Sequence, residues 1–136
     1  MKIQDLDGNI HKWKIEGSVV RFNDQRPRSQ LHLTARSLIK EIYPTLQICE
    51  EVSVQIKRDR KVFLDFYINT IKTVVEVHGQ QHYKFNSLYH TSAQDFLNQK
   101  KRDQNLQDWC VLNNLNYIEL PFNEDKDKWH QRFIKI

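Results

Sequence analysis

Cysteine is scarce in this sequence: only Cys49 and Cys110 are present, too far apart to form a Cys-x-x-Cys pair. Two thiols cannot build the disulfide framework of a small secreted protein. No zinc-finger spacing of cysteine and histidine is present either. We therefore expect both cysteines to be buried thiols, with Cys110 on the apolar face of a helix.

Long apolar runs are also missing. No stretch approaches the roughly 20 apolar residues that span a membrane, and the amino terminus lacks the apolar region of a signal peptide. Internal repeats and low-complexity segments are absent as well. These absences predict a protein with no membrane partner that works inside the cell, in the cytoplasm.

Length and charge narrow the class further. A chain of 136 residues with 39% hydrophobic residues is long enough for one core, so we expect a single domain over residues 1–136. The 21 Lys and Arg residues exceed the 17 Asp and Glu residues, which gives a net charge of +4. This excess suits a polyanionic partner such as DNA, although a basic protein need not bind one.

Turn and capping signals predict the hairpin and the helices. Asp7-Gly8 is typical of a two-residue hairpin turn, so the extension at 1–22 is predicted to form a β-hairpin that extends or clasps the main sheet. Ser29 and Ser92 are suitable helix N-caps. Helices are predicted at 30–43, from 92 to 113–114, and within the terminal segment 122–136.

Strands are predicted from β-branched and aromatic runs at 52–56, 62–68, 73–77 and 117–120. The short basic turn at 57–61 forces the first two of these strands to pair antiparallel. The segment 29–121 therefore forms an α/β (α+β) core with the element order αβββαβ.

Carboxylates interrupt two of these apolar strands, at Asp65 and Glu76. A buried carboxylate is costly unless it is paired or binds a cation. We expect both to bind Mg²⁺, with Asp65 as the first ligand and Glu76 as the second, and Mn²⁺ as a substitute. The alternatives are structural, because Asp65 could pair with Arg102 and Glu76 could accept hydrogen bonds from an arginine or a histidine.

Two histidines follow Glu76 closely. His82 leaves the strand after Gly79, and an ordinary histidine pKa of about 6.5 suits it to take a proton from the attacking water. His78 is the alternative base or a phosphate contact, and Gln80 could orient the water or the scissile phosphate. A zinc site formed by His78 and His82 is another interpretation.

The αβββαβ core, with Asp65 on its second strand and Glu76 on its third, resembles the PD-(D/E)XK nucleases, which include restriction enzymes and Holliday-junction resolvases. The resemblance covers residues 29–121 and implies a restriction-endonuclease-like fold, a central mixed sheet flanked by helices. Where that family has Glu-x-Lys, this chain has Glu76-Val77-His78, so the family's lysine is missing.

A narrower branch shares more of the pattern. Asp65, His78-Gly79, His82 and the pair Arg102-Asp103 follow an order that resembles very-short-patch repair endonucleases and the related phage homing endonucleases. The run from Glu76 to Tyr83 is similar to that of small phage proteins, which would place the protein in a bacterial host. Where related nucleases have a glutamate on the first helix, this chain has His32. The residues that the resemblance and the chemistry together make catalytic candidates are Asp65, Glu76, His78, Gln80, His82, His32 and Asp103.

Basic residues supply the predicted contacts with the DNA backbone. Such contacts hold the duplex without reading its sequence. In the loop at 85–90, Phe85 and Tyr89 could wedge between bases. For the basic run at 100–102, the alternative is a solvated helix face. The predicted DNA-binding residues are Arg26, Arg28, Arg36, Arg58, Arg60, Lys100, Lys101 and Arg102.

Three functional hypotheses follow from these residues and their order. The favoured one is a Mg²⁺-dependent endodeoxyribonuclease that hydrolyses phosphodiester bonds and, as a monomer with one site, nicks one strand. The second is a Holliday-junction or branched-DNA resolvase, which needs a homodimer to cut two strands. The third is an inactive nuclease-fold module that binds DNA or protein, which the missing lysine and His32 favour.

Overall fold

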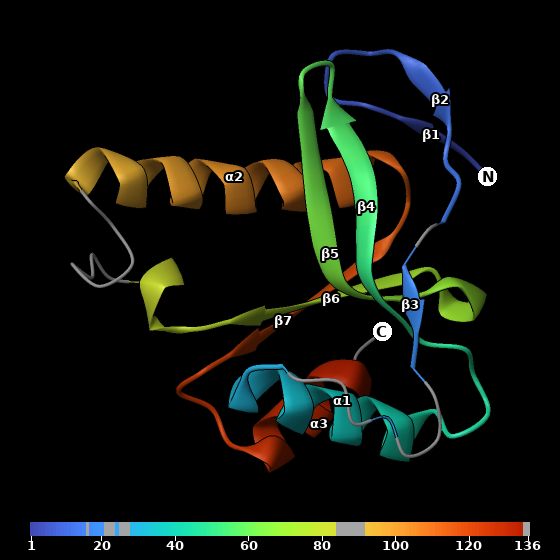
Figure 1. Ribbon diagram of the computed structural model, residues 1–136, viewed down its shortest axis with the longest axis vertical. Helices are drawn as coiled ribbons and strands as arrows, with labels where there is room; N and C mark the ends of the chain where they lie inside the picture. The colour runs from blue at the N-terminus through green and yellow to red at the C-terminus, as the bar shows by residue number, and fades with distance from the viewer. Residues whose placement is uncertain (16, 21–23, 25–27, 84–91, 135–136) are drawn as a thin grey trace.

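Helices pack on both faces of a five-stranded sheet in the computed structural model of the protein, which describes residues 1–15, 17–20, 24, 28–83 and 92–134 (Figure 1). The strand order is β3-β4-β5-β6-β7. The first four strands pair antiparallel and β6 pairs with β7 in parallel, which makes the sheet mixed. The strands are β3 (Ser18–Val19), β4 (Cys49–Lys57), β5 (Arg60–Ile68), β6 (Thr73–His78) and β7 (Asn116–Pro121).

The two faces of the sheet have separate cores. Helix α1 (Gln30–Ile42) and helix α3 (Lys126–Ile134) cover one face, where Leu38 and Ile39 of α1 meet Trp129 of α3. Helix α2 (Ala93–Leu112) covers the other face through Leu106 and Trp109. Of the helices in the described residues, none combines the length and apolar character needed to cross a membrane.

The amino-terminal hairpin clasps the core and does not extend the main sheet. Strands β1 (Lys2–Gln4) and β2 (Ile10–Lys12) form a two-stranded sheet of their own. Ile3 of β1 and Trp13, just after β2, are buried in the core under α2, and the Leu6 N–H donates to the Ile56 carbonyl at 2.8 Å.

The predicted two-residue hairpin turn is wrong. The last paired residues are Gln4 and Ile10, so the loop is longer. The Asp5 carboxylate organises it by accepting hydrogen bonds from the N–H groups of Asp7 and Asn9, at 3.0 and 2.9 Å. Gly8 still supplies the positive φ, at +91°, that the Asp7-Gly8 pair predicted.

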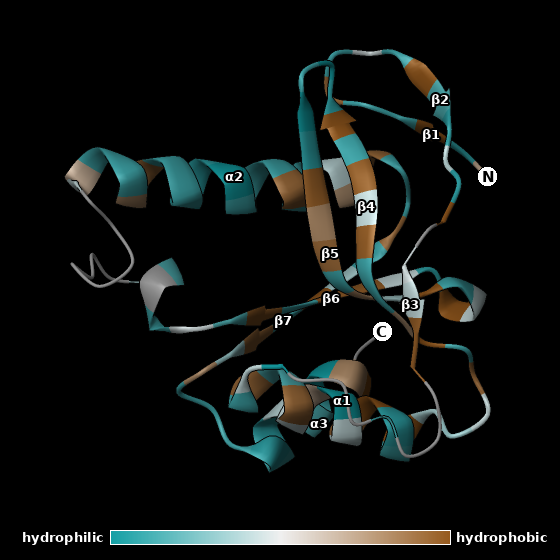
Figure 2. Cartoon of the chain, viewed as in Figure 1, coloured by the Kyte–Doolittle hydropathy of each residue, from teal (hydrophilic) through white to brown (hydrophobic). Residues whose placement is uncertain are grey.

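Most of the predicted elements are confirmed. Ser29 and Ser92 cap α1 and α2 by accepting hydrogen bonds from backbone N–H groups three residues on. The predicted strands are present with longer bounds, and β5 begins within the predicted turn because Lys57 pairs with Arg60. The short strand β3 was not predicted. Figure 2 shows that the turn and the start of β5 are hydrophilic, as their charged residues require.

Strands β4 and β5 exchange faces part-way along their length. Glu50 pairs with Phe66 and contacts α1, whereas Val52 pairs with Leu64 in the core under α2. In a regular strand residues two apart share a face. The switch falls at Glu51, whose φ of 54° is unusual for a residue other than glycine. Asp65 occupies the corresponding point of β5, between Leu64 and Phe66.

An ion cluster is buried between α1 and β4. The fully buried Glu50 carboxylate accepts hydrogen bonds from Arg36 Nε at 2.6 Å and Arg36 Nη2 at 3.0 Å, and His32 Nε2 lies 3.1 Å from Glu50 Oε1. Burial alone would raise the pKa of Glu50, but the hydrogen bonds from Arg36 and His32 outweigh it and lower that pKa. Arg28 Nε lies 3.8 Å from Glu50.

This cluster corrects the predicted DNA contact of Arg36. Arg36 is 4% exposed and its guanidinium is held by Glu50 and Asp24. It cannot reach a phosphate from this position, so its role is structural. Arg28 belongs to the edge of the same cluster. Arg26 lies outside the described residues, as do Phe85 and Tyr89.

We predict that Arg36→Leu destabilises the protein by about 3–5 kcal/mol, because it leaves the Glu50 carboxylate buried without its main partner. Urea denaturation measures the free energy of unfolding. Arg58→Leu, at an exposed arginine, is the matched control and should change it by less than about 0.5 kcal/mol. Adding Glu50→Leu to Arg36→Leu should recover much of the loss. A loss below about 1 kcal/mol in the single variant would contradict the assigned role.

Candidate active site

A cavity of about 770 Å³ lies between the β4–β5 hairpin, the end of β6 and one side of α2. It brings together residues that are distant in the sequence, because β5, β6 and α2 each supply one part of its lining. The predicted catalytic residues that line it are Asp65, Glu76, His78, His82 and Asp103.

Asp65 and Glu76 hold each other in place through backbone hydrogen bonds. The Asp65 N–H donates to Glu76 Oε2 at 2.7 Å, and the Val77 N–H donates to Asp65 Oδ2 at 2.8 Å. Regular pairing of β5 with β6 extends only to Phe66 and Val75. Beyond that point the two carboxylates accept the hydrogen bonds that backbone carbonyls of the neighbouring strand would accept in a regular sheet. These hydrogen bonds fix both side chains at the cavity wall.

The electrostatics of this pair favour a cation. Burial raises the pKa of Glu76 well above its usual range, and the negative charge of Asp65 raises it further. Two carboxylates this close repel each other unless a proton or a cation lies with them. Mg²⁺ is commonly bound by one or two carboxylates together with water, so the donor set fits a hard divalent cation.

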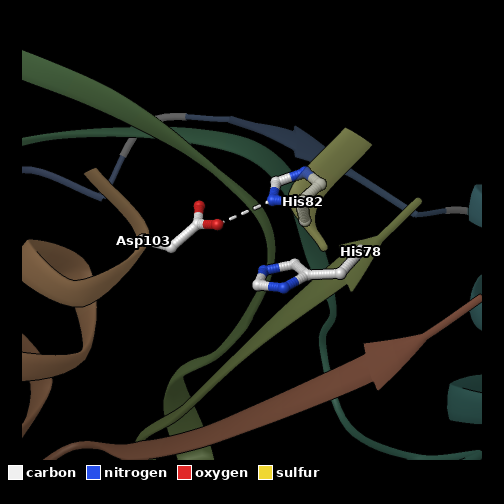
Figure 3. Close-up of side chains that lie close together, drawn as sticks. All are labelled: His78, His82 and Asp103. Carbon is white, nitrogen blue, oxygen red and sulfur yellow. Dashed lines mark hydrogen bonds and ion pairs between the residues drawn. The ribbon is translucent and has the colours of Figure 1, made fainter. Parts of the chain in front are cut away.

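His82 is oriented by Asp103. The short 3₁₀ helix at Gln80–His82 (η2) follows β6 and turns the chain toward α2. His82 Nδ1 lies 2.9 Å from Asp103 Oδ2 (Figure 3). His82 Nε2 lies 3.3 Å from the side-chain amide nitrogen of Gln99. An ionised carboxylate only accepts hydrogen bonds, so Nδ1 carries the proton. Nε2 then carries the lone pair, and the Gln99 amide donates to it.

His78 is engaged at both ring nitrogens. It is 3% exposed, with Nδ1 at 3.1 Å from Glu119 Oε1 and Nε2 at 3.3 Å from the Tyr117 hydroxyl. The other oxygen of Glu119 accepts a hydrogen bond from the Tyr83 hydroxyl at 2.6 Å. The hydrogen bond from His78 lowers the pKa of Glu119 to about 2, with burial opposing and Tyr83 assisting.

The geometry does not favour the zinc interpretation of the histidine pair. Ligand atoms of His78, His82 and Asp103 lie within 4.8 Å of one another, which is close enough for an ion. However, the two rings are stacked, with centroids 4.1 Å apart and planes 10° apart. Imidazole lone pairs lie in the ring plane, so stacked parallel rings cannot both point at one ion. One ring would have to turn and leave Glu119 or Asp103.

The other two predicted catalytic residues lie outside the cavity lining. Gln80 is exposed on η2. His32 is buried on α1, stacked on Phe66 with centroids 4.4 Å apart. It is nevertheless near the site, because ligand atoms of His32, Glu51 and Asp65 lie within 4.8 Å of one another. Glu51 was not predicted as a site residue, and it lies just before the predicted strand at 52–56.

Basic residues from two separate elements line the cavity. They come from the β4–β5 hairpin and from α2. Arg58 and Lys100 are not part of the lining: Arg58 lies at the hairpin turn, and Lys100 Nζ lies 5.0 Å from the ring centroid of Tyr83. The cavity-lining cations are Lys57, Arg60, Lys61, Lys101 and Arg102.

Comparison with known proteins finds viral relatives. Over 59 residues the chain is 39% identical to uncharacterized protein 307L of Invertebrate iridescent virus 6 and 36% identical to uncharacterized protein 033L of Invertebrate iridescent virus 3; each alignment covers 43% of this chain and 30% of the relative. Uncharacterized protein 094L of Frog virus 3 (isolate Goorha) is 34% identical over 64 residues, 46% of this chain and 41% of the relative. The chain therefore matches less than half of each relative's length. No family profile and no solved structure matches.

We predict a pH-dependent contribution of Glu119 to stability. Its pKa is near 2 when folded and ordinarily 4.5, so the contribution is complete above pH 4.5 and is lost as the pH falls toward 2. Glu119→Gln should lower the free energy of unfolding by about 2 kcal/mol at neutral pH, with the difference shrinking as the pH falls below 4.5. Denaturation over a pH series measures this. Glu41→Gln, at an exposed glutamate, should show little difference at any pH.

Proposed function

We propose that this protein is a divalent-metal-dependent DNA endonuclease with a restriction-endonuclease-like fold, using Mg²⁺, for which Mn²⁺ can substitute, and nicking one strand. The observation that carries the proposal is one cavity that holds three features together: the Asp65–Glu76 carboxylate pair, the His82–Asp103 pair, and cations from two elements. Phosphodiester hydrolysis needs a site that stabilises negative charge, a base, and cations that bind the anionic backbone. The carboxylate pair, the His82–Asp103 pair and the basic residues fit these needs in that order.

Asp65 and Glu76 are the residues that would hold the cation. Each uses one oxygen in the exchange of backbone hydrogen bonds described above. Burial and then the charge of Asp65 raise the pKa of Glu76, and a bound cation would oppose both effects. When bound, a divalent cation neutralises charge on the phosphate and on the leaving oxygen. His32 lies 3.1 Å from Glu50. In this proposal it helps to hold the strands in place and does not contact the substrate.

His82 is the general base in this proposal. Its Nε2 carries the lone pair, which accepts from the Gln99 amide at 3.3 Å and can take a proton from a water molecule when that contact opens. Asp103 then stabilises the protonated ring through the 2.9 Å contact at Nδ1. His78 is less suited to this task, because Glu119 and Tyr117 occupy its two nitrogens. We assign His78 to positioning, as the ring on which His82 stacks.

The cations from the two elements would hold the DNA backbone. Arg60 and Lys61 on the hairpin and Lys101 and Arg102 on α2 line the same cavity as the two carboxylates. Contacts of this kind neutralise phosphates and make binding strongly dependent on salt. They fix the register of a strand without reading its bases.

The order and pairing of the elements support the proposed fold. A helix precedes three antiparallel strands, and a second helix leads to a strand parallel to the third, with Asp65 and Glu76 on adjacent strands. This is the arrangement expected of the PD-(D/E)XK nucleases. The place of their lysine is taken by His78, so the chemistry proposed here relies on His82. An inactive DNA-binding module is the outcome if no cleavage is found.

We predict that Asp65→Asn abolishes Mg²⁺-dependent nicking of a supercoiled plasmid while DNA binding and the circular dichroism spectrum stay unchanged. Asparagine keeps an oxygen for the Val77 N–H but removes the charge that holds the cation. Nicking is measured with Mg²⁺, with Mn²⁺ and with EDTA. Asp108→Asn, at an exposed aspartate on α2, is the control and should nick normally. Normal nicking by Asp65→Asn would place the metal elsewhere.

We predict that His82→Ala lowers the nicking rate at saturating DNA at least about a hundredfold, the usual scale for a general base, with little change in DNA affinity. Asp103→Asn should lower the rate less, because it removes the orientation of the ring and leaves the base in place. His130→Ala, at an exposed histidine of α3, is the control. A full rate in His82→Ala would exclude His82 as the base.

A further inference from the structure

Phe63 is an exposed aromatic residue inside the candidate active site. It lies on β5, two residues before Asp65, and its side chain is 60% exposed. Single exposed apolar residues are common on protein surfaces and need no function. Phe63 differs because it lines the same cavity as the carboxylate pair, among side chains that are mostly charged or polar.

The residues around Phe63 indicate the chemistry of a ligand that could bind over its ring. Arg60 and Lys61 precede it on the same strand, and Lys101 and Arg102 of α2 line the same cavity. A ligand that satisfies these neighbours must be anionic and must also present a flat apolar face. A nucleotide has both parts, a phosphate and a base.

The form of the nucleic acid follows from the accessibility of that base. In an intact duplex the faces of the bases are covered by their stacked neighbours, whereas an unpaired base exposes a face on which an aromatic side chain can stack. A cavity of about 770 Å³ is also of the size that encloses a small ligand, roughly one or two nucleotides, and not a double helix.

We propose that Phe63 is a stacking platform for an unpaired base next to the scissile phosphate, so that the preferred substrate is a single strand or DNA with an unpaired nucleotide. The inference rests on the proposed function for the identity of the ligand as DNA. Because every base has a π face, the platform tolerates any base and selects unpaired over paired DNA.

Binding of fluorescein-labelled oligonucleotides by the full chain in EDTA, where no metal-dependent cleavage occurs, tests the platform. We expect Phe63→Ala to weaken binding of a single strand about tenfold and binding of the matched duplex less than about twofold. Phe63→Leu keeps an apolar side chain without a π face and should behave like Phe63→Ala, whereas Phe63→Trp should bind like the wild type. Val111→Ala, at an exposed position of α2 outside the cavity, should change neither.

Equal binding of the single strand by the wild type and Phe63→Ala would overturn the inference, as would an equal loss on both forms of DNA or no binding by the wild type. Nicking of a plasmid with Mg²⁺ is measured separately. If the protein does not nick but its single-strand binding depends on Phe63, the nuclease proposal fails and the platform stands. If it nicks and Phe63 has no effect on binding, the nuclease proposal stands and the platform fails.

Discussion

The reciprocal hydrogen bonds between Asp65 and Glu76 are the constraint around which the rest of the site is arranged. Each carboxylate is fixed by a backbone N–H of the partner strand, so two like charges are held side by side where they would otherwise separate. Backbone donors stabilise the charged forms, while burial and mutual repulsion act against them. The face switch at Glu51 makes this possible, because it frees Asp65 from the regular alternation of β5.

The two faces of the sheet treat buried charge in opposite ways. Under α1, the Glu50 carboxylate is matched by Arg36 and His32, and its pKa is lowered. Under α2, Asp65 and Glu76 face each other, and the pKa of Glu76 is raised. In the first arrangement the buried carboxylate has its partners within the chain, so its role is structural. In the second, burial and the neighbouring carboxylate both disfavour the charged form of Glu76, and strongly perturbed groups of this kind cluster at functional sites.

Much of this arrangement could be predicted from the sequence. Helical and strand periodicities, together with the caps Ser29 and Ser92, predict the core elements, and the spacing of acidic and histidine residues predicts their convergence in one cavity. The failures have physical causes. Arg36 looked like a surface cation because its partner Glu50 lies on another element, and the left-handed conformation of Glu51 has no sequence signature. The partners of His78 lie on β7, far along the chain.

The parallel pairing of β6 with β7 has a consequence for the order of folding. Tyr117 and Glu119, which fix His78, arrive on a strand that follows the whole of α2, and Tyr117 is 39 residues from His78 in the sequence. Contacts between distant segments cost more loop-closure entropy and form late. The antiparallel strands that carry Asp65 and Glu76 can therefore assemble before the histidine stack is oriented. On the proposed function, a partly folded chain would hold its carboxylates before the His78 ring, on which His82 stacks, is fixed in place.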